Sequence, residues 1–134
     1  MSVHHVELWV ADLGAAVPRW EWLLGALGWT EYQQWEHGRS WRAPGGADAP
    51  YVVLEQSPAL RPGAAHDRLA PGLNHLALHA PSRPAVDALV EHAATHGWSL
   101  MFADRHPWAG GPQHYAAYLE DPDGFEVEVV APGD

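Results

Sequence analysis

The chain has 134 residues, enough for one compact domain with a real core. It contains no cysteine, which excludes disulfides, thiolate metal sites and a cysteine nucleophile. The net charge of −10 would repel phosphate backbones and anionic lipid, so we expect neither nucleic acid nor a membrane surface as a partner. There is no apolar run of membrane-spanning length and no basic leader, and the expected location is the cytoplasm.

The first half of the chain predicts a strand, a helix and three further strands. Residues 3–10 alternate between apolar and polar side chains, as a half-buried strand requires, and His5 and Trp9 fall on the polar face. A helix follows, from an N-cap at Asp12 to a stop at Gly28. Three strands are then expected, at residues 29–36, 39–43 and 50–56.

The second half repeats this plan after a segment rich in proline, residues 58–71, that we interpret as a linker. A strand is expected at 73–80 and a helix at 82–96, followed by strands at 98–103, 114–120 and 125–130. The chain therefore predicts two modules, 1–57 and 72–134, that together form one domain. The irregular loop at 104–113 is a candidate lid or mouth.

Two histidines and two glutamates occupy matched places in these halves. His5 and His75 lie near the start of the first strand of each half, and Glu55 and Glu128 lie in the last strand. Strand alternation points all four side chains away from the apolar face that would pack against a helix. Mixed imidazole and carboxylate ligation suits Zn²⁺, Ni²⁺, Fe²⁺ or Mn²⁺. The pattern predicts a four-ligand metal site, although each residue alone is more typical of a structural histidine or a solvated glutamate.

These motifs resemble those of the vicinal oxygen chelate superfamily, which includes glyoxalase I, bleomycin-resistance proteins, fosfomycin-resistance enzymes and extradiol dioxygenases. His5-Val6-Glu7-Leu8-Trp9-Val10 is similar to the opening strand of the family. Leu73-Asn74-His75-Leu76-Ala77-Leu78 is similar to the opening of its second module. Asp121-Pro122-Asp123-Gly124-Phe125-Glu126-Val127-Glu128 looks like its closing turn and strand, with the last ligand at Glu128.

The resemblance implies an α+β fold of paired βαβββ modules that form a curved, bowl-like mixed sheet with helices outside. It also implies that the domain is completed by homodimerisation and that Glu55 takes the place of the fourth ligand of glyoxalase I. Two adjacent oxygens of a small substrate would then chelate the ion, and Glu128 or Glu55 would move a proton. The leading interpretation is a metal-dependent lyase or isomerase of the glyoxalase type.

Two alternatives stay open. A ring-cleaving dioxygenase generally uses two histidines and one carboxylate, and a fourth ligand argues against it. A metal-free protein that sequesters an aromatic drug or metabolite, like the bleomycin-resistance proteins, is favoured by the eight tryptophans of the chain.

Several aromatic and imidazole side chains are candidates for the walls of the substrate pocket. Core or interface packing is the competing interpretation for the aromatic residues, and a wall residue without a chemical role is the competing one for the histidines. His4, on the apolar side of its strand, is expected to be structural. The candidate wall residues are Trp9, Trp35, Trp41, His79, His106, Trp108, His114 and Tyr115.

Overall fold

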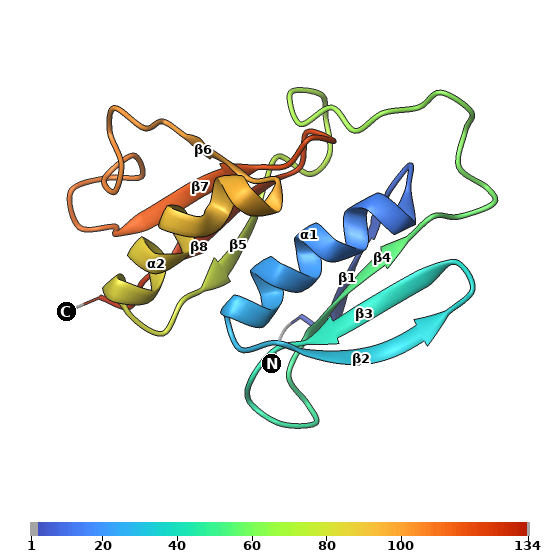
Figure 1. Cartoon of the computed structure of the whole chain (residues 1–134), viewed down its shortest axis with the longest axis horizontal. Helices are drawn as coiled ribbons and strands as arrows, with labels where there is room; N and C mark the ends of the chain where they lie inside the picture. Colours follow the sequence, from blue (N-terminus) through green and yellow to red (C-terminus); the bar gives the residue numbers. More distant parts are fainter. Residues whose placement is uncertain (1–2, 134) are drawn as a thin grey trace. The chain divides into compact units, whose positions relative to one another are not determined.

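The computed structural model describes residues 3–133 and divides the chain into two compact units, Met1–Ala65 (unit 1) and His66–Asp134 (unit 2) (Figure 1). The boundary falls inside the segment interpreted as a linker. Residues 1, 2 and 134, at the outer ends of the two predicted modules, lie outside the described part. Both units have the order β-α-β-β-β, which confirms the α+β fold of paired βαβββ modules. No helix within residues 3–133 combines the length and the apolar character that crossing a membrane requires.

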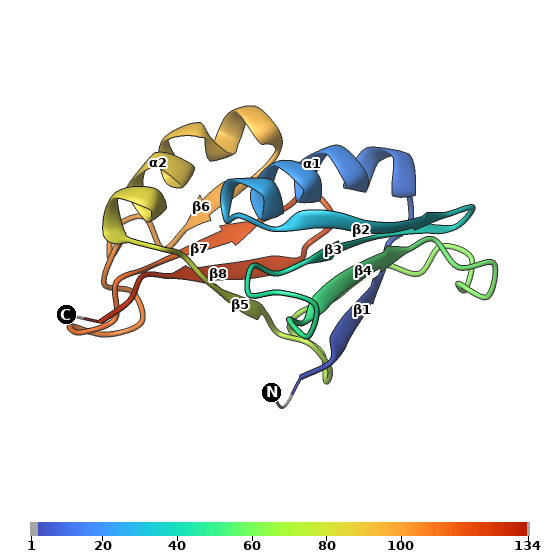
Figure 2. The same ribbon diagram turned by 90° about the horizontal axis from the view of Figure 1, so that it is seen from below.

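Unit 1 is a four-stranded mixed sheet with one helix against it. The sheet order is β1-β4-β3-β2, with β1 parallel to β4 and the other neighbours antiparallel. Helix α1 covers one face of this sheet (Figure 2). The elements are β1 (His5–Trp9), α1 (Leu13–Ala26), β2 (Thr30–Trp35), β3 (Gly38–Arg42) and β4 (Tyr51–Glu55).

Unit 2 repeats this topology with the order β5-β8-β7-β6, and β5 is parallel to β8. Helix α2 lies over one face of this second sheet and continues into the short helix η1 (Figure 2). The elements are β5 (Leu76–His79), α2 (Arg83–Ala93), η1 (Ala94–His96), β6 (Ser99–Met101), β7 (Ala116–Glu120) and β8 (Glu126–Val130).

Helix α1 begins and ends where the sequence predicts, whereas the predicted helix at 82–96 is divided into α2 and the short helix η1. The Asp12 carboxylate accepts a hydrogen bond from the Ala15 amide at 3.1 Å, and the Ser82 hydroxyl accepts one from the Ala85 amide at the same distance. At the other ends, Gly28 and Gly97 adopt the left-handed conformation, with φ of 87° and 88°. These caps fix the turns by which each helix returns to its own sheet.

The core of each unit lies between its helix and one face of its sheet. In unit 1 the side chains of Trp20, Leu23 and Leu24 are fully buried, as is Leu54 on β4. In unit 2, Val127 and Val129 of β8 are fully buried in the same way. Because neighbouring residues of a strand point to opposite faces, the alternate positions lie on the face away from the helix, here called the open face.

Candidate functional site

The open face of unit 2 carries a buried carboxylate between two imidazoles. Glu128 is only 6% exposed, and its Oε1 lies 3.2 Å from Nε2 of His75. Its other oxygen, Oε2, bonds to Nε2 of His114, which lies in the loop before β7. The structure thus brings together three of the predicted site residues: a metal-ligand histidine, a metal-ligand glutamate and a pocket histidine.

Tyr118 on β7 is a further partner of Glu128 that the sequence alone did not single out. Burial, followed by the negative charge of Glu128 and a hydrogen bond to it, raises the pKa of Tyr118 above its ordinary value. Tyr118 therefore keeps its proton at neutral pH and donates to the carboxylate. Its register opposite Glu128 in the β7·β8 pair explains the contact.

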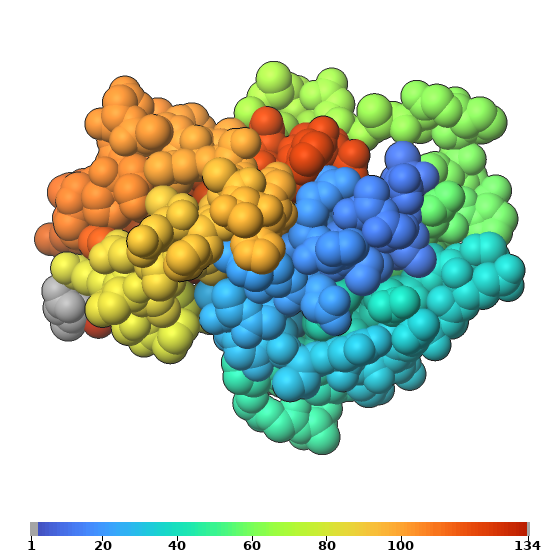
Figure 3. All heavy atoms as spheres, viewed as in Figure 1, coloured from blue at the N-terminus to red at the C-terminus, as the bar shows by residue number. Residues whose placement is uncertain are grey.

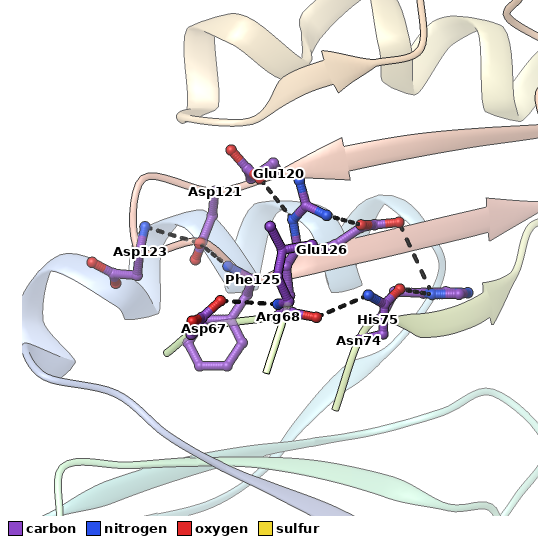
Figure 4. A network of polar contacts seen from close by, with 10 residues as sticks. Asp67, Arg68, Asn74, His75, Glu120, Asp121, Asp123, Phe125 and Glu126 are labelled. Carbon is purple, nitrogen blue, oxygen red and sulfur yellow. Dashed lines mark hydrogen bonds and ion pairs between the residues drawn. The ribbon is translucent and has the colours of Figure 1, made fainter. Parts of the chain in front are cut away.

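The second ring nitrogen of His75 is held from the linker side (Figure 4). His75 Nδ1 lies 2.8 Å from the side-chain oxygen of Asn74, and the Asn74 amide donates to the Arg68 carbonyl at 2.9 Å. Because the Asn74 nitrogen donates to the Arg68 carbonyl, the Asn74 side-chain oxygen is the atom that faces His75. This oxygen can only accept a hydrogen bond, so Nδ1 of His75 carries the proton. The lone pair of the neutral ring is then on Nε2, directed at Glu128.

Arg68 ties this arrangement to the sheet. Its guanidinium bridges the carboxylates of Glu120 and Glu126, at 3.0 Å and 3.3 Å, and Glu126 is buried like Glu128 (Figure 4). The two buried glutamates therefore differ in their surroundings. Glu126 is paired with an arginine, whereas Glu128 is surrounded by imidazoles and a tyrosine.

The loop between β6 and β7 passes close over this cluster, and Figure 3 shows the loop, in orange, on the surface of unit 2. Gly110 makes the approach possible. A Cβ atom at this position would lie 2.5 Å from His114 Cδ2 and 2.6 Å from the Tyr118 hydroxyl oxygen. The contact supports the prediction that this loop forms one edge of the site.

In unit 1, His5 and Glu55 both lie on the open face, but they are not at the same level of the sheet. His5 pairs with Tyr51, and Glu55 pairs with Trp9, four residues further along. At the rise of a β-strand this offset is about 13 Å, and Glu55 accepts instead from the Trp35 indole at 3.3 Å. Within unit 1 the two predicted ligands therefore do not converge.

The register also shows that Glu55 and Glu128 are not equivalent positions. In unit 2, Glu128 pairs with Ala77, which lies two residues beyond His75. In unit 1, the residue two places beyond His5 is Glu7, and its partner is Val53. The place that Glu128 occupies in unit 2 is thus held by an apolar side chain in unit 1. Matching the two glutamates across the halves was wrong, because the sequence gives strand alternation but not the pairing of the strands.

The candidate wall residues divide between the two faces of the sheets. Trp9, Trp35 and His79 lie on the open faces and are exposed, and their assignment to the pocket walls stays a prediction. The prediction for Trp41 was wrong: it is 2% exposed and pairs with Val52 on the helix side, where it belongs to the core.

Trp108 and Tyr115 also lie away from Glu128. Their rings meet edge to face at 5.3 Å, and the Tyr115 hydroxyl bonds to Asp87 of α2, so both lie on the helix side of the sheet. The prediction that Trp108 and Tyr115 form pocket walls beside the Glu128 cluster was therefore wrong. His106 lies half-buried in the same loop, and its assignment to the pocket stays a prediction.

The donors in unit 2 fit part of a metal site. Two ligand atoms about 2.1 Å from one ion are about 3.0–3.4 Å apart at octahedral or tetrahedral angles, which matches the 3.2 Å between His75 Nε2 and Glu128 Oε1. With Nδ1 of His75 protonated, the lone pair of its Nε2 faces the carboxylate oxygen Oε1 of Glu128, and these two acceptors repel each other. A proton or a metal ion between the two atoms would remove this repulsion. Within each unit, however, the described residues contain no group of three or more side chains suited to hold a metal.

The fold and the cluster define a class of protein built from two βαβββ modules with an imidazole–carboxylate centre on an open sheet face. Residues 4–118 match the family model of the Glyoxalase/Bleomycin resistance protein/Dioxygenase superfamily. The chain belongs to this superfamily.

Three relatives illustrate the range of similarity. The uncharacterized protein YqjT of Bacillus subtilis strain 168 is 46% identical over 132 residues, covering 97% of this chain and 98% of that protein. The crystal structure of a provisionally named glyoxalase from Bacillus halodurans is 42% identical with a TM-score of 0.87, covering 98% of this chain and 96% of the other. A lactoylglutathione lyase from Agrobacterium tumefaciens has a TM-score of 0.62 at 20% identity, covering 97% and 92%, and shows the fold alone.

Proposed function

We propose that the protein is a metal-dependent enzyme that acts on a small substrate through two neighbouring substrate oxygens. The observation that carries this proposal is Glu128, a buried carboxylate whose two oxygens face His75 and His114 and pair with no arginine within residues 3–133. A buried carboxylate in such surroundings is typical of a metal ligand or of a group that transfers protons.

The proposed ligands are His75 and Glu128 of unit 2, and the assignment of His5 as a third ligand stays a prediction. A divalent ion held by them would stabilise negative charge that develops on the chelated substrate oxygens. Glu55 is left out of this set, because its register places it beside Trp9 and Trp35. Zn²⁺, Ni²⁺, Fe²⁺ and Mn²⁺ all accept two imidazoles and a carboxylate.

The residues around Glu128 suit proton transfer. The carboxylate would take a proton from the substrate carbon next to the chelated oxygens and return it to the neighbouring carbon. His114 shares the second oxygen of Glu128 and would exchange that proton with solvent, while Tyr118 holds the carboxylate in place. Lyase or isomerase chemistry of the glyoxalase type is therefore our first choice, in line with the name of the Bacillus halodurans relative.

Ring-cleaving oxygenase chemistry becomes a stronger alternative than the sequence indicated. Without Glu55 the proposed set is two histidines and one carboxylate, which is the ligand pattern of non-haem iron oxygenases. Iron found as the bound metal, with consumption of dioxygen, would favour this alternative over the lyase.

A sequestering protein is the second candidate function, and one observation favours it. Trp9, Tyr32 and Trp35 of unit 1 are 43%, 44% and 37% exposed, although large aromatic side chains are usually buried. Such rings would stack on a flat drug or metabolite. This candidate requires no metal.

Elemental analysis of untagged protein separates these functions. We expect close to one divalent metal ion per chain, lost in His75→Ala and in Glu128→Gln. Metal-free protein that cannot be loaded with Zn²⁺, Ni²⁺, Fe²⁺ or Mn²⁺ would overturn the enzyme proposal. Light scattering of the same sample tests the proposed homodimer, and fractionation of the source cells tests the proposed cytoplasmic location.

A further inference from the structure

Unit 1 contains a pocket at one end of its open face, beside His5 but built from other residues. It has a volume of about 540 Å³, within the range of small-molecule sites. Arg42 at the end of β3 and Tyr51 at the start of β4 line it, together with Tyr32 of β2 and His4. His4 was expected to be structural, and it lines this pocket from the position just before β1.

Arg42 is fixed in this pocket by the backbone. Its Nη1 donates to the carbonyl oxygens of Ala47 at 2.6 Å and Ala49 at 2.8 Å, which uses both hydrogens of that nitrogen. Its Cζ lies 4.1 Å from the ring centre of Tyr32 and 5.3 Å from that of Tyr51. The guanidinium is therefore oriented before any ligand arrives.

The remaining edge of the guanidinium is available. No acceptor within residues 3–133 bonds to Nε or Nη2 of Arg42, and Asp48, which also lines the pocket, forms no ion pair with it in this part of the chain. The free Nε–Nη2 edge presents two parallel N–H groups, the geometry that binds a carboxylate through both oxygens.

The pocket also offers flat surfaces for a ring. Tyr51 stacks on His5 with centroids 4.8 Å apart and planes 6° from parallel, and His4 meets Tyr51 edge to face at 5.4 Å. An aromatic group attached to a carboxylate on Arg42 would lie along these rings.

We propose that this pocket binds the carboxylate of an aromatic organic acid, with Arg42 as its anchor. That this acid is the substrate rests on the proposed function, because the pocket residues Tyr51 and His4 both contact His5, a predicted metal ligand. Binding of the acid itself requires no metal.

Calorimetric titration of chelator-treated protein with 2-naphthoate and with its neutral analogue 2-naphthamide tests the proposal. We expect the carboxylate to bind at least about 10-fold more tightly, because hydrogen bonds from a guanidinium to a charged carboxylate are stronger than those to a neutral amide. Equal affinity for the two probes would overturn the proposal. Because this comparison needs no variant and no metal, its failure is distinguishable from a failure to find bound metal.

Arg42→Gln and Arg39→Gln form a matched pair on the same strand. Arg39 lies on the opposite face of β3, where it pairs with Glu31 at 4.0 Å, and is absent from the pocket lining. We expect Arg42→Gln to reduce the affinity for 2-naphthoate to that for 2-naphthamide, and Arg39→Gln to leave it unchanged. Equal effects of the two substitutions would contradict the role of Arg42. Circular dichroism checks that both variants fold. If Arg42→Gln does not fold, the affinities of the wild-type protein for 2-naphthoate and 2-naphthamide decide the proposal.

Discussion

At His75, the two ring nitrogens have partners of different kinds. Nδ1 donates to the Asn74 side chain, and Nε2 faces the Glu128 carboxylate at 3.2 Å. A hydrogen bond to the remote nitrogen of a metal-ligating histidine fixes its orientation and increases its basicity. Asn74 thereby connects the linker residue Arg68, whose carbonyl it donates to, with the proposed centre.

Removing this hydrogen bond should weaken metal binding. We expect Asn74→Ala to lower the Zn²⁺ affinity about 10–100-fold, the usual effect of losing such an outer partner. Asn74→Asp keeps an acceptor for Nδ1 and should restore most of the affinity. Competition with a chelator of known affinity measures both variants, and an Asn74→Ala protein that binds Zn²⁺ as well as the wild type would contradict the role of Asn74.

At Tyr115, a hydrogen bond joins the loop before β7 to α2. The bond to Asp87, then burial and the charge of Asp87, raise the pKa of Tyr115 above its ordinary value. A raised pKa in the folded state means that this contribution to stability is complete below the ordinary tyrosine value of about 10 and disappears as the pH rises through the folded value.

Tyr115→Phe should therefore make the protein less stable at pH 8 but not in strong alkali. The expected loss at pH 8 is about 1 kcal/mol, the contribution of one hydrogen bond. Urea unfolding of both proteins between pH 8 and 11 measures it. The difference should shrink above about pH 10, and a constant difference across this range would show that the ionisation of Tyr115 is not coupled to folding.

At the level of the elements, the sequence predicted much of the fold, because its signals are local. Alternation in β1 and the caps of α1 at Asp12 and Gly28 depend on neighbouring residues, and the structure confirms them. The pairing of β1 with β4 depends on contacts across about 50 residues, for which a single sequence carries no signal. That is why the equivalence of Glu55 with Glu128 failed while the direction of both side chains was right.

The same limit applies to the pocket walls. Trp41 and Tyr115 are aromatic, as wall residues often are, but only strand pairing and the position of the helix show that they lie on the helix side. Tyr118 and Arg42 were missed because nothing in the sequence distinguishes them from other strand residues. Placing Tyr118 opposite Glu128 required the register of β7 and β8.

The loop before β7 depends on Gly110 for its close approach to the cluster. We expect Gly110→Ala to displace His114 and Tyr118 and to destabilise the protein by about 1–3 kcal/mol, the usual range for a forced overlap. Gly25→Ala in α1 is the matched control, because a Cβ there meets no atom within 4 Å and should stabilise the helix by about 0.5–1 kcal/mol. Urea unfolding measures both, and equal effects of the two substitutions would contradict the packing argument.

At the scale of the whole molecule, a bound metal would link the proposed centre on the open face of unit 2 to the stability of the folded protein. A ligand that binds only the folded protein raises its stability in proportion to the logarithm of its concentration over the dissociation constant. Bound metal should therefore stabilise the folded protein.

The two glutamates that the sequence treated alike give the sharpest test of this arrangement. Zn²⁺ at about 100 times its dissociation constant should stabilise the wild-type protein by about 2.7 kcal/mol. Glu55→Gln should keep this stabilisation, because Glu55 lies at the level of Trp9, whereas Glu128→Gln should lose nearly all of it. Calorimetric melting with and without Zn²⁺ measures all three proteins. Equal losses in the two variants would restore the four-ligand site, and stabilisation retained in Glu128→Gln would remove the carboxylate on which the proposed function depends.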